Sequence, residues 1–390
     1  MEKFIKKILL LGSTGSIGVS TLDVVKAFPK EFRVESLVAG RNLERLRPQI
    51  ALFKPKAVGV ADAADAKALR RDFPGIRVFA GEKGIVDLAR ESRADLAVAA
   101  IVGEAGLRPT YAALQTGKDL ALANKEALVM AGAFFTSEAR MRKQAILPID
   151  SEHCALHQAL RSGKRSEVRR LILTASGGPF WEMPREAFAR IRVEDALKHP
   201  TWRMGPKITV DSATLGNKAL EVIEAHFLFG LRAEKISVVL HPQSIIHSIV
   251  EWRDGSMIAQ MGVNDMRFPI QYALTYPRRL PAPYGFLSLT GLKLEFHEPD
   301  GRKFPLLGLG YEALRKGGAY PAAFSLANEL AVLAFLARGI RFVDIPVVVE
   351  RVLERLGDPR PGSLEELLAL CAQVRRRTRS EMKNLRKAVQ

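Results

Sequence analysis

Cysteine is scarce in this chain of 390 residues, which contains only Cys154 and Cys371. Two cysteines so far apart cannot provide the disulfide framework of a small secreted domain, so we expect a cytoplasmic protein. Aromatic residues make up only 7% of the sequence, and they do not alternate with basic residues as they do on surfaces that stack bases. We therefore expect no nucleic-acid partner, although the formal net charge is +17.

Long hydrophobic runs are also missing. The most apolar stretch, residues 322–337, is interrupted by Asn328 and Glu329 and is shorter than the roughly 20 residues that cross a bilayer. Near the N-terminus, the apolar run at residues 8–11 is too short for the hydrophobic region of a signal peptide. We expect no membrane partner and no export signal, and we interpret residues 322–337 as a buried helix.

Positive charge is concentrated at the C-terminal end, where a single acidic residue, Glu381, accompanies seven basic ones. The basic residues are Arg375, Arg376, Arg377, Arg379, Lys383, Arg386 and Lys387. A solvated basic surface is the simplest interpretation, and attraction of phosphorylated small molecules is a second use of the same charge. A nucleic-acid-binding protein that uses this tail is the alternative from another functional class.

The pattern of apolar segments predicts an α/β fold. In residues 1–150, short apolar strands alternate with amphipathic segments, which is typical of a Rossmann-like, doubly wound parallel sheet. We expect its strands at residues 7–11, 33–39, 57–60, 77–80, 96–101, 119–121 and 146–149. Residues 151–275 mix helical segments with strands at 168–174, 236–240, 245–252 and 257–261, which predicts an α+β catalytic domain. Residues 276–302, rich in proline and glycine, form a linker to a C-terminal α-helical bundle at 303–390.

Three glycines, Gly12, Gly15 and Gly18, follow the first predicted strand and precede an amphipathic segment. Glycines at this spacing permit a tight turn, close approach of the backbone to a pyrophosphate, and close packing of helix on strand. The N-terminus of the helix adds N–H donors for an anion. The turn therefore predicts a bound dinucleotide, with a purely structural turn as the alternative.

The residues after the second predicted strand bear on which dinucleotide is bound. NAD-dependent enzymes usually place an acidic residue there, on the ribose 2′-hydroxyl. This chain has Gly40, Arg41 and Asn42, and an arginine suits the 2′-phosphate of NADPH. We predict NADPH, and the alternative is that Arg41 is an ordinary surface residue.

A polar cluster, Asp150, Ser151, Glu152 and His153, follows the strand predicted at 146–149. If the chain stays extended, residues 150 and 152 share a face, and two such carboxylates suit a hard divalent cation such as Mg²⁺ or Mn²⁺. Alternatively, Asp150 or Ser151 caps a helix that begins there. His153 and His157 are four residues apart, which also permits a zinc hydrolase with Glu152 as its base, although a histidine packed within the fold is a simpler interpretation.

Two later segments have the composition of an anion site. Ser176 begins a glycine-rich turn after a strand, and Ser212, Asn217 and Lys218 supply further donors of the kind that a phosphate monoester needs. Glu221 lies one helical turn after Lys218 and either adds a third carboxylate to the metal or forms only a surface ion pair.

Between these two segments lies a predicted lid, at about residues 196–208. It contains Trp202 and Met204 beside two prolines and a glycine. Large apolar side chains in such a loop predict that it closes over a charged substrate and excludes water.

Eight motifs in one order resemble the 1-deoxy-D-xylulose 5-phosphate reductoisomerase family. They are GSTGSIG at 12–18, LANKE at 122–126, DSEH at 150–153, SGGPF at 176–180, HPTWRMG at 199–205, DSAT at 211–214, NKALE at 217–221 and HPQSIIHS at 241–248. The resemblance implies an NADPH- and metal-dependent homodimeric enzyme of the non-mevalonate (MEP) isoprenoid pathway. Such an enzyme isomerises and reduces 1-deoxy-D-xylulose 5-phosphate to 2-C-methyl-D-erythritol 4-phosphate.

The resemblance also implies roles for individual residues. The ligands of Mg²⁺, Mn²⁺ or Co²⁺ would be Asp150, Glu152 and Glu221. Cofactor contacts would be Thr14, Gly15, Ser16, Ile17, Gly40, Arg41, Asn42, Asn124, Glu126 and Gly205. Substrate contacts would be Lys125, Ser151, Glu152, Ser176, His199, Trp202, Met204, Ser212, Asn217, Lys218 and Glu221. Lys125 or His153 would assist proton transfer, and the sequence does not choose between them.

The chain departs from the family pattern at Arg203, where serine is frequent, at Gly216, where a bulky apolar residue is frequent, and at Ala219, where glycine is usual. These changes bear on lid motion and on affinity for the substrate, not on the reaction. A different NADP-dependent dehydrogenase of sugar phosphates is the alternative function, and it would not require three metal-binding carboxylates.

Overall fold

The structure is a computed structural model that describes residues 5–202 and 204–389, with only the backbone described for 386–389. Arg203, one of the departures from the family pattern, therefore lies outside the described residues, as do the side chains of Arg386 and Lys387 in the basic tail. The chain forms two compact units. The first contains the residues up to 127, 135–154 and 265–285, and the second contains 128–134, 155–264 and the residues from 286 onward.

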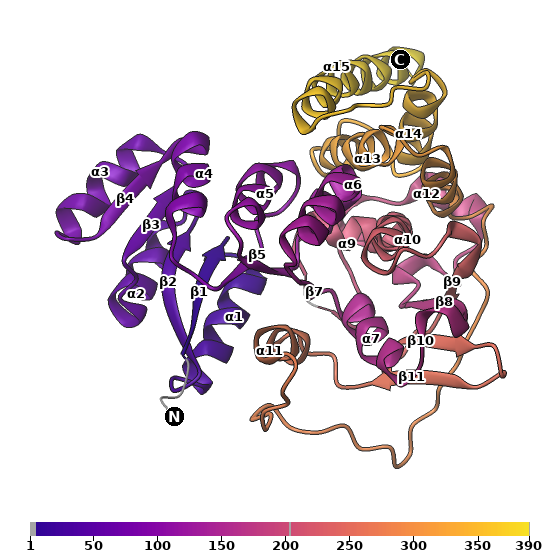
Figure 1. Ribbon diagram of the computed structural model, residues 1–390. Helices are drawn as coiled ribbons and strands as arrows, with labels where there is room; N and C mark the ends of the chain where they lie inside the picture. Colours follow the sequence, from indigo (N-terminus) through magenta and orange to yellow (C-terminus); the bar gives the residue numbers. More distant parts are fainter. Residues whose placement is uncertain (1–4, 203, 390) are drawn as a thin grey trace. The chain divides into compact units, whose positions relative to one another are not determined.

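A parallel seven-stranded sheet lies at the centre of the first unit, in the order β4-β3-β2-β1-β5-β6-β7 (Figure 1). Its strands are β1 (Lys6–Leu11), β2 (Phe32–Val38), β3 (Ala57–Val60), β4 (Arg77–Ala80), β5 (Leu96–Ala99), β6 (Asp119–Leu122) and β7 (Ile146–Pro148). The predicted doubly wound sheet and its seven strands are confirmed. The strand order reverses at β1, and the loops that follow the carboxyl ends of strands at such a point are where α/β sheets bind ligands.

Helices connect these strands. They are α1 (Ser16–Ala27), α2 (Leu43–Phe53), α3 (Ala63–Asp72), α4 (Gly81–Glu91), α5 (Leu107–Gln115) and α6 (Lys125–Arg142), and α7 (Ser151–Ala159) follows β7. Helix α11 (Arg267–Thr275) also belongs to the first unit, although its residues fall within the predicted catalytic domain. Its apolar side chains Ile270, Ala273 and Leu274 are buried in the same core as Leu10 and Val24. The division into three domains at residues 150, 275 and 302 stays a prediction.

The second unit contains a mixed four-stranded sheet in the order β11-β10-β8-β9. Its strands are β8 (Val168–Ala175), β9 (Ile236–Leu240), β10 (Ile246–Trp252) and β11 (Met257–Met261). β8 pairs with β9 in parallel, whereas β10 is antiparallel to both β8 and β11. The second unit also contains three helices between β8 and β9: α8 (Val193–Ala196), α9 (Pro206–Ala213) and α10 (Gly216–Phe229). All four predicted strands are confirmed, as is the α+β character of this region.

Four long helices follow the connection that the sequence predicts at residues 276–302. They are α12 (Pro305–Lys316), α13 (Tyr320–Leu336), α14 (Asp344–Glu354) and α15 (Leu364–Val389). The apolar stretch at 322–337 corresponds to α13, which packs against α9, α12, α14 and α15 and is buried over most of its length. Short 3-10 helices lie at Glu104–Gly106, Leu160–Ser162, Arg165–Glu167, Gly178–Phe180, Arg185–Arg190 and Ala233–Lys235. Among the described residues, no helix is both long and apolar enough to cross a membrane.

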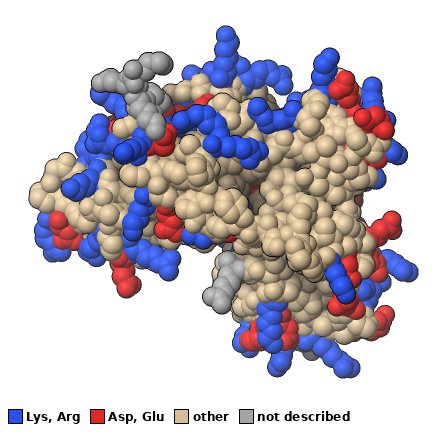
Figure 2. Space-filling view, turned by 90° about the horizontal axis from the view of Figure 1, so that it is seen from below, with Lys and Arg blue, Asp and Glu red and all other residues tan. Residues whose placement is uncertain are grey.

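The basic residues of α15 lie mostly on its exposed side. Arg376, Arg377, Arg379 and Lys383 are exposed, whereas Glu381 is buried and pairs with Arg355. On the face shown in Figure 2, lysine and arginine side chains are interspersed with acidic ones. The interpretation of the tail as a solvated basic surface stays a prediction.

Candidate active site

The turn after β1 needs glycine at two positions for steric reasons. Gly12 has φ +98°, and a Cβ there would clash with the carbonyl of Ala100, which follows β5. A Cβ on Gly18 would clash with the carbonyl of Gly12. At Gly15, by contrast, the nearest atom to a Cβ would be 3.6 Å away, and α1 begins at the next residue, Ser16. The backbone at Gly15 is thus open in front of a helix N-terminus, as a pyrophosphate requires.

Helix α2 supports this turn through two side chains that the sequence reasoning missed. Gln49 Nε2 donates a hydrogen bond to the carbonyl oxygen of Ser13 at 2.9 Å, and Arg45 Nη1 donates to that of Thr14 at 3.3 Å. The spacing of four residues places both on one face of α2. The four-residue spacing of Arg45 and Gln49 is visible in the sequence. Only the tertiary structure shows that this face of α2 contacts the backbone of the turn after β1.

The loop between β2 and α2 leaves its polar groups open to solvent. Gly40 and Arg41 are exposed, and Asn42 caps α2 by accepting a hydrogen bond from the backbone N–H of Arg45 at 3.0 Å. Arg41 is therefore accessible to an anionic group on this side of the turn. Its role in choosing NADPH stays a prediction.

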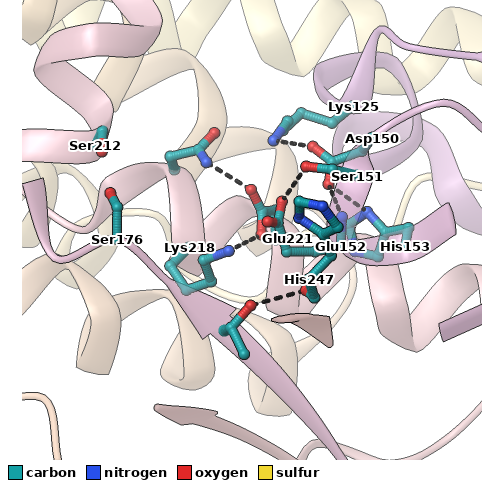
Figure 3. Close-up of polar contacts among 12 residues, drawn as sticks. Lys125, Asp150, Ser151, Glu152, His153, Ser176, Ser212, Lys218, Glu221 and His247 are labelled. Carbon is teal, nitrogen blue, oxygen red and sulfur yellow. Dashed lines mark hydrogen bonds and ion pairs between the residues drawn. The ribbon is translucent and has the colours of Figure 1, made fainter. Parts of the chain in front are cut away.

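Helix α6 begins at the loop after β6 and places two predicted site residues. Asn124 caps the helix: its Oδ1 accepts from the N–H of Ala127 at 3.1 Å and its Nδ2 donates to the carbonyl of Gly103 at 2.9 Å. Lys125 is the first helical residue, and its Nζ lies 2.5 Å from Asp150 Oδ2 (Figure 3). Since Gly103, Asn124 and Asp150 follow β5, β6 and β7, these contacts join three loops at one edge of the sheet.

Asp150 is the N-cap of α7. Its Oδ1 accepts from the N–H of Glu152 at 3.2 Å, and its carbonyl accepts from the N–H of Cys154 at 2.8 Å. The expectation that residues 150 and 152 share a face of an extended chain is wrong, because the helix begins at Ser151. Oδ1 of Asp150 accepts the capping bond and Oδ2 faces Lys125 Nζ. Because each carboxylate oxygen has two acceptor sites, the cap and a metal ligand are compatible. Ser151 Oγ donates to Glu152 Oε2 at 3.0 Å.

The two histidines of α7 have different surroundings. His153 is fully buried, and its Nδ1 lies 3.5 Å from Asp150 Oδ1. Burial lowers the pKa of His157, and Arg161 lowers it further. Among the described residues, the groups that can hold a metal include His153 but not His157. A zinc site that uses both histidines is therefore disfavoured.

In the second unit, His199 lies between two serines. Its Nε2 is 3.0 Å from Ser176 Oγ and 3.1 Å from Ser212 Oγ. Its Nδ1 accepts hydrogen bonds from the N–H groups of Thr201 and Trp202 at 3.1 and 2.9 Å. The ring is therefore neutral with its proton on Nε2, and burial lowers the pKa of His199. The arrangement gathers small donors around one point, as an anion site requires.

Helix α10 brings three predicted residues together. Asn217 Nδ2 donates to Glu221 Oε1 at 2.5 Å, and Lys218 Nζ contacts Glu221 Oε2 (Figure 3). Lys218 is 4% exposed and Glu221 is fully buried. The alternative that Lys218 and Glu221 form a surface ion pair is therefore wrong. Both oxygens of the buried Glu221 carboxylate therefore have a partner within the fold: the Asn217 amide on Oε1 and the Lys218 ammonium on Oε2.

The segment of the predicted lid leads directly into α9. Gly205 is the N-cap of α9, and Trp202 and Met204 are half-buried. The Trp202 ring lies 6.5 Å from the ring of His247, a residue that the sequence reasoning did not single out. Lid closure and the substrate contacts of Trp202 and Met204 stay predictions.

The structure offers a packing explanation for Ala219. A Cβ added at Gly310, on α12, would lie 2.6 Å from the Cβ of Ala219. The methyl group of Ala219 is therefore accommodated by the lack of a side chain at Gly310 on the facing helix. The helices α10 and α12 pack against each other there.

Comparison with known proteins covers nearly the whole chain. Residues 8–132 match the family described as 1-deoxy-D-xylulose 5-phosphate reductoisomerase, residues 146–229 match its C-terminal domain family, and residues 261–377 match a further DXP reductoisomerase C-terminal domain family. A 1-deoxy-D-xylulose 5-phosphate reductoisomerase of Anaeromyxobacter dehalogenans is 50% identical, over 95% of this chain and 96% of that protein. One from Geobacter sp. is 51% identical, over 93% and 95%.

Solved structures agree with this result. The 1-deoxy-D-xylulose 5-phosphate reductoisomerase from Zymomonas mobilis in complex with NADPH superposes with a TM-score of 0.91 at 40% identity, over 97% of this chain and 99% of that one. A DOX-P reductoisomerase in complex with NADPH, fosmidomycin and magnesium gives a TM-score of 0.92 at 37% identity, over 98% and 99%.

Proposed function

The chain belongs to the 1-deoxy-D-xylulose 5-phosphate reductoisomerase family, and from this premise we propose how its own residues serve the reaction. The enzyme isomerises 1-deoxy-D-xylulose 5-phosphate and reduces it to 2-C-methyl-D-erythritol 4-phosphate, with NADPH and a divalent metal ion, in the non-mevalonate pathway. When bound, NADPH supplies the hydride and the metal ion stabilises negative charge on the oxygens of the substrate. The observation that carries the assignment of residues is the group of three carboxylates formed by Asp150, Glu152 and Glu221.

Asp150, Glu152 and Glu221 form one of the acidic groups in this chain that can hold a metal ion. Carboxylate oxygens are the ligands that Mg²⁺ and Mn²⁺ prefer, so the chemistry of the donor set fits a hard divalent cation. Each member is also held by a neighbour: Asp150 by Lys125, Glu152 by Ser151, and Glu221 by Lys218. We assign these three residues as the metal ligands, for magnesium or for manganese or cobalt.

The turn at residues 12–18 fits a dinucleotide for two reasons. The backbone at Gly15 has open space beside it, and α1 directs its first N–H groups there. Thr14, Ser16 and Ile17 would then contact the pyrophosphate side of the cofactor, and the exposed Arg41 would meet the 2′-phosphate. Asn124 and Gly205 serve as helix caps in the structure, so any contact that they make with the cofactor is additional to that role.

The phosphate end of the substrate fits the group around His199. Ser176, Ser212 and the Nε2–H of His199 are small donors, and Lys218 carries the positive charge that a phosphate needs. Asn217 provides a further amide on the same helix as Lys218. We propose that these residues bind the phosphate and thereby hold the rest of the substrate in one orientation.

Lys125 and His153 are the two candidates to move a proton. His153 is fully buried beside Asp150, which suits a residue that orients this carboxylate. Lys125 pairs with the same carboxylate from the start of α6 and ends in an ammonium group, which can donate a proton. We assign the proton transfer to Lys125 and the orientation of Asp150 to His153.

Replacement of Glu152 by glutamine tests the metal assignment. We expect Glu152→Gln to lose metal-dependent turnover of 1-deoxy-D-xylulose 5-phosphate and to bind Mn²⁺ more weakly, as measured by electron paramagnetic resonance. NADPH binding, measured by the fluorescence of the nicotinamide, should be retained and shows that the variant folds. Continued NADPH oxidation with this substrate would contradict the assignment and would favour an ordinary sugar-phosphate dehydrogenase.

The second unit also has the features of a subunit interface. Strand β11 is at the edge of its sheet and exposes Met257 and Ile258, and the connection before α12 exposes Phe286, Leu289 and Phe296. An apolar edge strand of this kind invites pairing with another chain. We propose a homodimer through this surface, which sedimentation equilibrium of the wild type and of Ile258→Lys would test. We also propose a cytoplasmic location, since both cysteines are free and buried.

A further inference from the structure

Asn328, in the middle of α13, is fully buried and has a charged partner. Its Nδ2 donates a hydrogen bond to Asp211 Oδ1 at 2.7 Å. The other carboxylate oxygen of Asp211, Oδ2, lies 2.8 Å from Lys207 Nζ. An aspartate paired with a lysine accepts hydrogen bonds only, so the amide of Asn328 must present its nitrogen and not its oxygen. The C-terminal helices are thereby connected to α9 by a charge-assisted hydrogen bond.

Asp211 also takes part in the corner between α9 and α10. Thr214 Oγ1 donates to the carbonyl of Asp211 at 3.1 Å and accepts from the N–H of Gly216 at 3.2 Å. Leu215, between them, has φ +55°, a left-handed conformation that surrounding contacts must hold in place for a leucine. The corner is thus a single hydrogen-bonded turn that begins at Asp211.

The other end of the Asn328 amide faces α10. A Cβ built on Gly216 would lie 3.3 Å from Asn328 Oδ1, and this oxygen has no hydrogen-bond partner among the described residues. Asn328 therefore lies between the last turn of α9 and the first residue of α10. The two helices that meet there carry Ser212 on one side of the corner and Asn217 and Lys218 on the other.

We propose that Asn328 is a positioning residue for the phosphate of the substrate. Its hydrogen bond to Asp211 fixes the corner, and the corner sets the distance between Ser212 and the pair Asn217 and Lys218. The proposal rests on the proposed function in one respect, the assignment of these three residues as phosphate ligands. If packing alone were required of Asn328, an apolar side chain would fill this buried place without the cost of desolvating an amide and a carboxylate.

The test compares Asn328→Leu with the wild type in steady-state kinetics. Leucine has a similar size but no donor, so one oxygen of Asp211 loses its partner and the corner is released. We expect the KM for 1-deoxy-D-xylulose 5-phosphate to rise about tenfold or more, the scale of a lost hydrogen bond to a charged group. The KM for NADPH should stay within about twofold, because the cofactor turn belongs to the first unit. Inhibition by inorganic phosphate should weaken in the same proportion as substrate binding.

A matched control is available on the same helix. Ser325 lies three residues before Asn328 and is buried, and its Oγ has no hydrogen-bond partner among the described residues. Ser325→Ala should therefore keep the kinetics of the wild type. If Asn328→Leu does not fold, Asn328→Ser, which keeps a shorter hydroxyl donor, replaces it in the same assays. Exchange of the two partners, Asp211→Asn with Asn328→Asp, recreates an amide–carboxylate bond and should recover most of the loss seen in Asn328→Asp alone.

An unchanged KM and an unchanged inhibition by phosphate in Asn328→Leu would overturn the proposal. A parallel rise in both KM values together with a lower melting temperature would also overturn it, since it would indicate general packing. Wild-type protein that does not convert 1-deoxy-D-xylulose 5-phosphate would instead refute the proposed function. Direct titration with inorganic phosphate, which needs no turnover, keeps the two failures separate.

Discussion

Lys125 Nζ lies 2.5 Å from Asp150 Oδ2, and this ion pair joins the first turn of α6 to the N-cap of α7. The two side chains are only 6% and 10% exposed. A pair so deeply buried is costly to break by removing one partner, because the other charge remains without compensation. The pair therefore stabilises the loops after β6 and β7 before any metal ion binds to Asp150.

Replacement of Lys125 by methionine tests this relationship. We expect Lys125→Met to lower the free energy of unfolding by about 3 kcal/mol, as measured by urea denaturation without metal. Saturating Mg²⁺ should reduce that difference, since the ion replaces the lost positive charge. The control is Lys118→Met, which removes a buried lysine whose pKa is lowered by burial. An equal loss of stability in both variants would show that the pairing with Asp150 is not the cause.

The neutral ring of His199 predicts a pH dependence of stability. Burial places the pKa of His199 below its unfolded value of about 6.5, so the unfolded chain binds the proton more readily. Protonation on Nδ1 would also break the hydrogen bonds from Thr201 and Trp202. The stability that the neutral ring contributes is complete above pH about 6.5 and is lost as the pH falls toward the folded pKa.

Urea denaturation at pH 7.5 and pH 5.5, in buffer without phosphate, measures this effect. His199→Asn keeps an oxygen that accepts from the two backbone N–H groups but does not titrate. The variant should therefore lose less stability than the wild type between the two pH values. A wild type and variant with the same pH dependence would assign the effect to other groups, such as His157, whose pKa is also lowered.

The close contact between α10 and α12 predicts a coupling between Gly310 and Ala219. Gly310→Ala would place two Cβ atoms 2.6 Å apart, and such overpacking costs about 1–3 kcal/mol. Alanine is favoured over glycine in a helix by about 1 kcal/mol, which offsets part of that cost. In an Ala219→Gly background the 2.6 Å contact is removed, although the added Cβ would still lie 3.1 Å from the Cα and 3.3 Å from the carbonyl oxygen of residue 219. Gly310→Ala should therefore be less destabilising there than in the wild type. Thermal unfolding of the wild type, the two single variants and the double variant gives the coupling free energy between the two positions. Additive effects of the two substitutions would refute the contact.

The exposed Arg41 predicts selectivity for NADPH. Arg41→Ala should raise the KM for NADPH about tenfold or more, the scale of a lost charge-assisted hydrogen bond to a phosphate. The KM for NADH, which has no 2′-phosphate, should change little in the same variant and serves as its internal control. If the KM values for NADPH and NADH rose equally, Arg41 would contribute to cofactor binding without recognising the 2′-phosphate.

Much of the architecture follows from local patterns. The strand–glycine–helix pattern at residues 7–28 predicts a tight turn between β1 and α1. This turn needs glycine at positions 12 and 18, where any other residue would clash. The seven strands of the first sheet were predictable for the same kind of reason, since alternating apolar runs and amphipathic segments are local properties. By contrast, the apolar face of α11 is equally visible in the sequence, but nothing local shows that it packs with the first sheet.

The sequence by itself determined the family, the dinucleotide turn and the types of residue that hold a metal ion and a phosphate, because these depend on short motifs in a fixed order. Only the tertiary structure decided that Asp150 is a helix cap paired with Lys125, that the contact between Lys218 and Glu221 is buried, and that Asn328 reaches Asp211 from a helix more than a hundred residues later in the chain. The physical reason is that hydrogen bonds and ion pairs between distant segments depend on packing, and packing has no local signature.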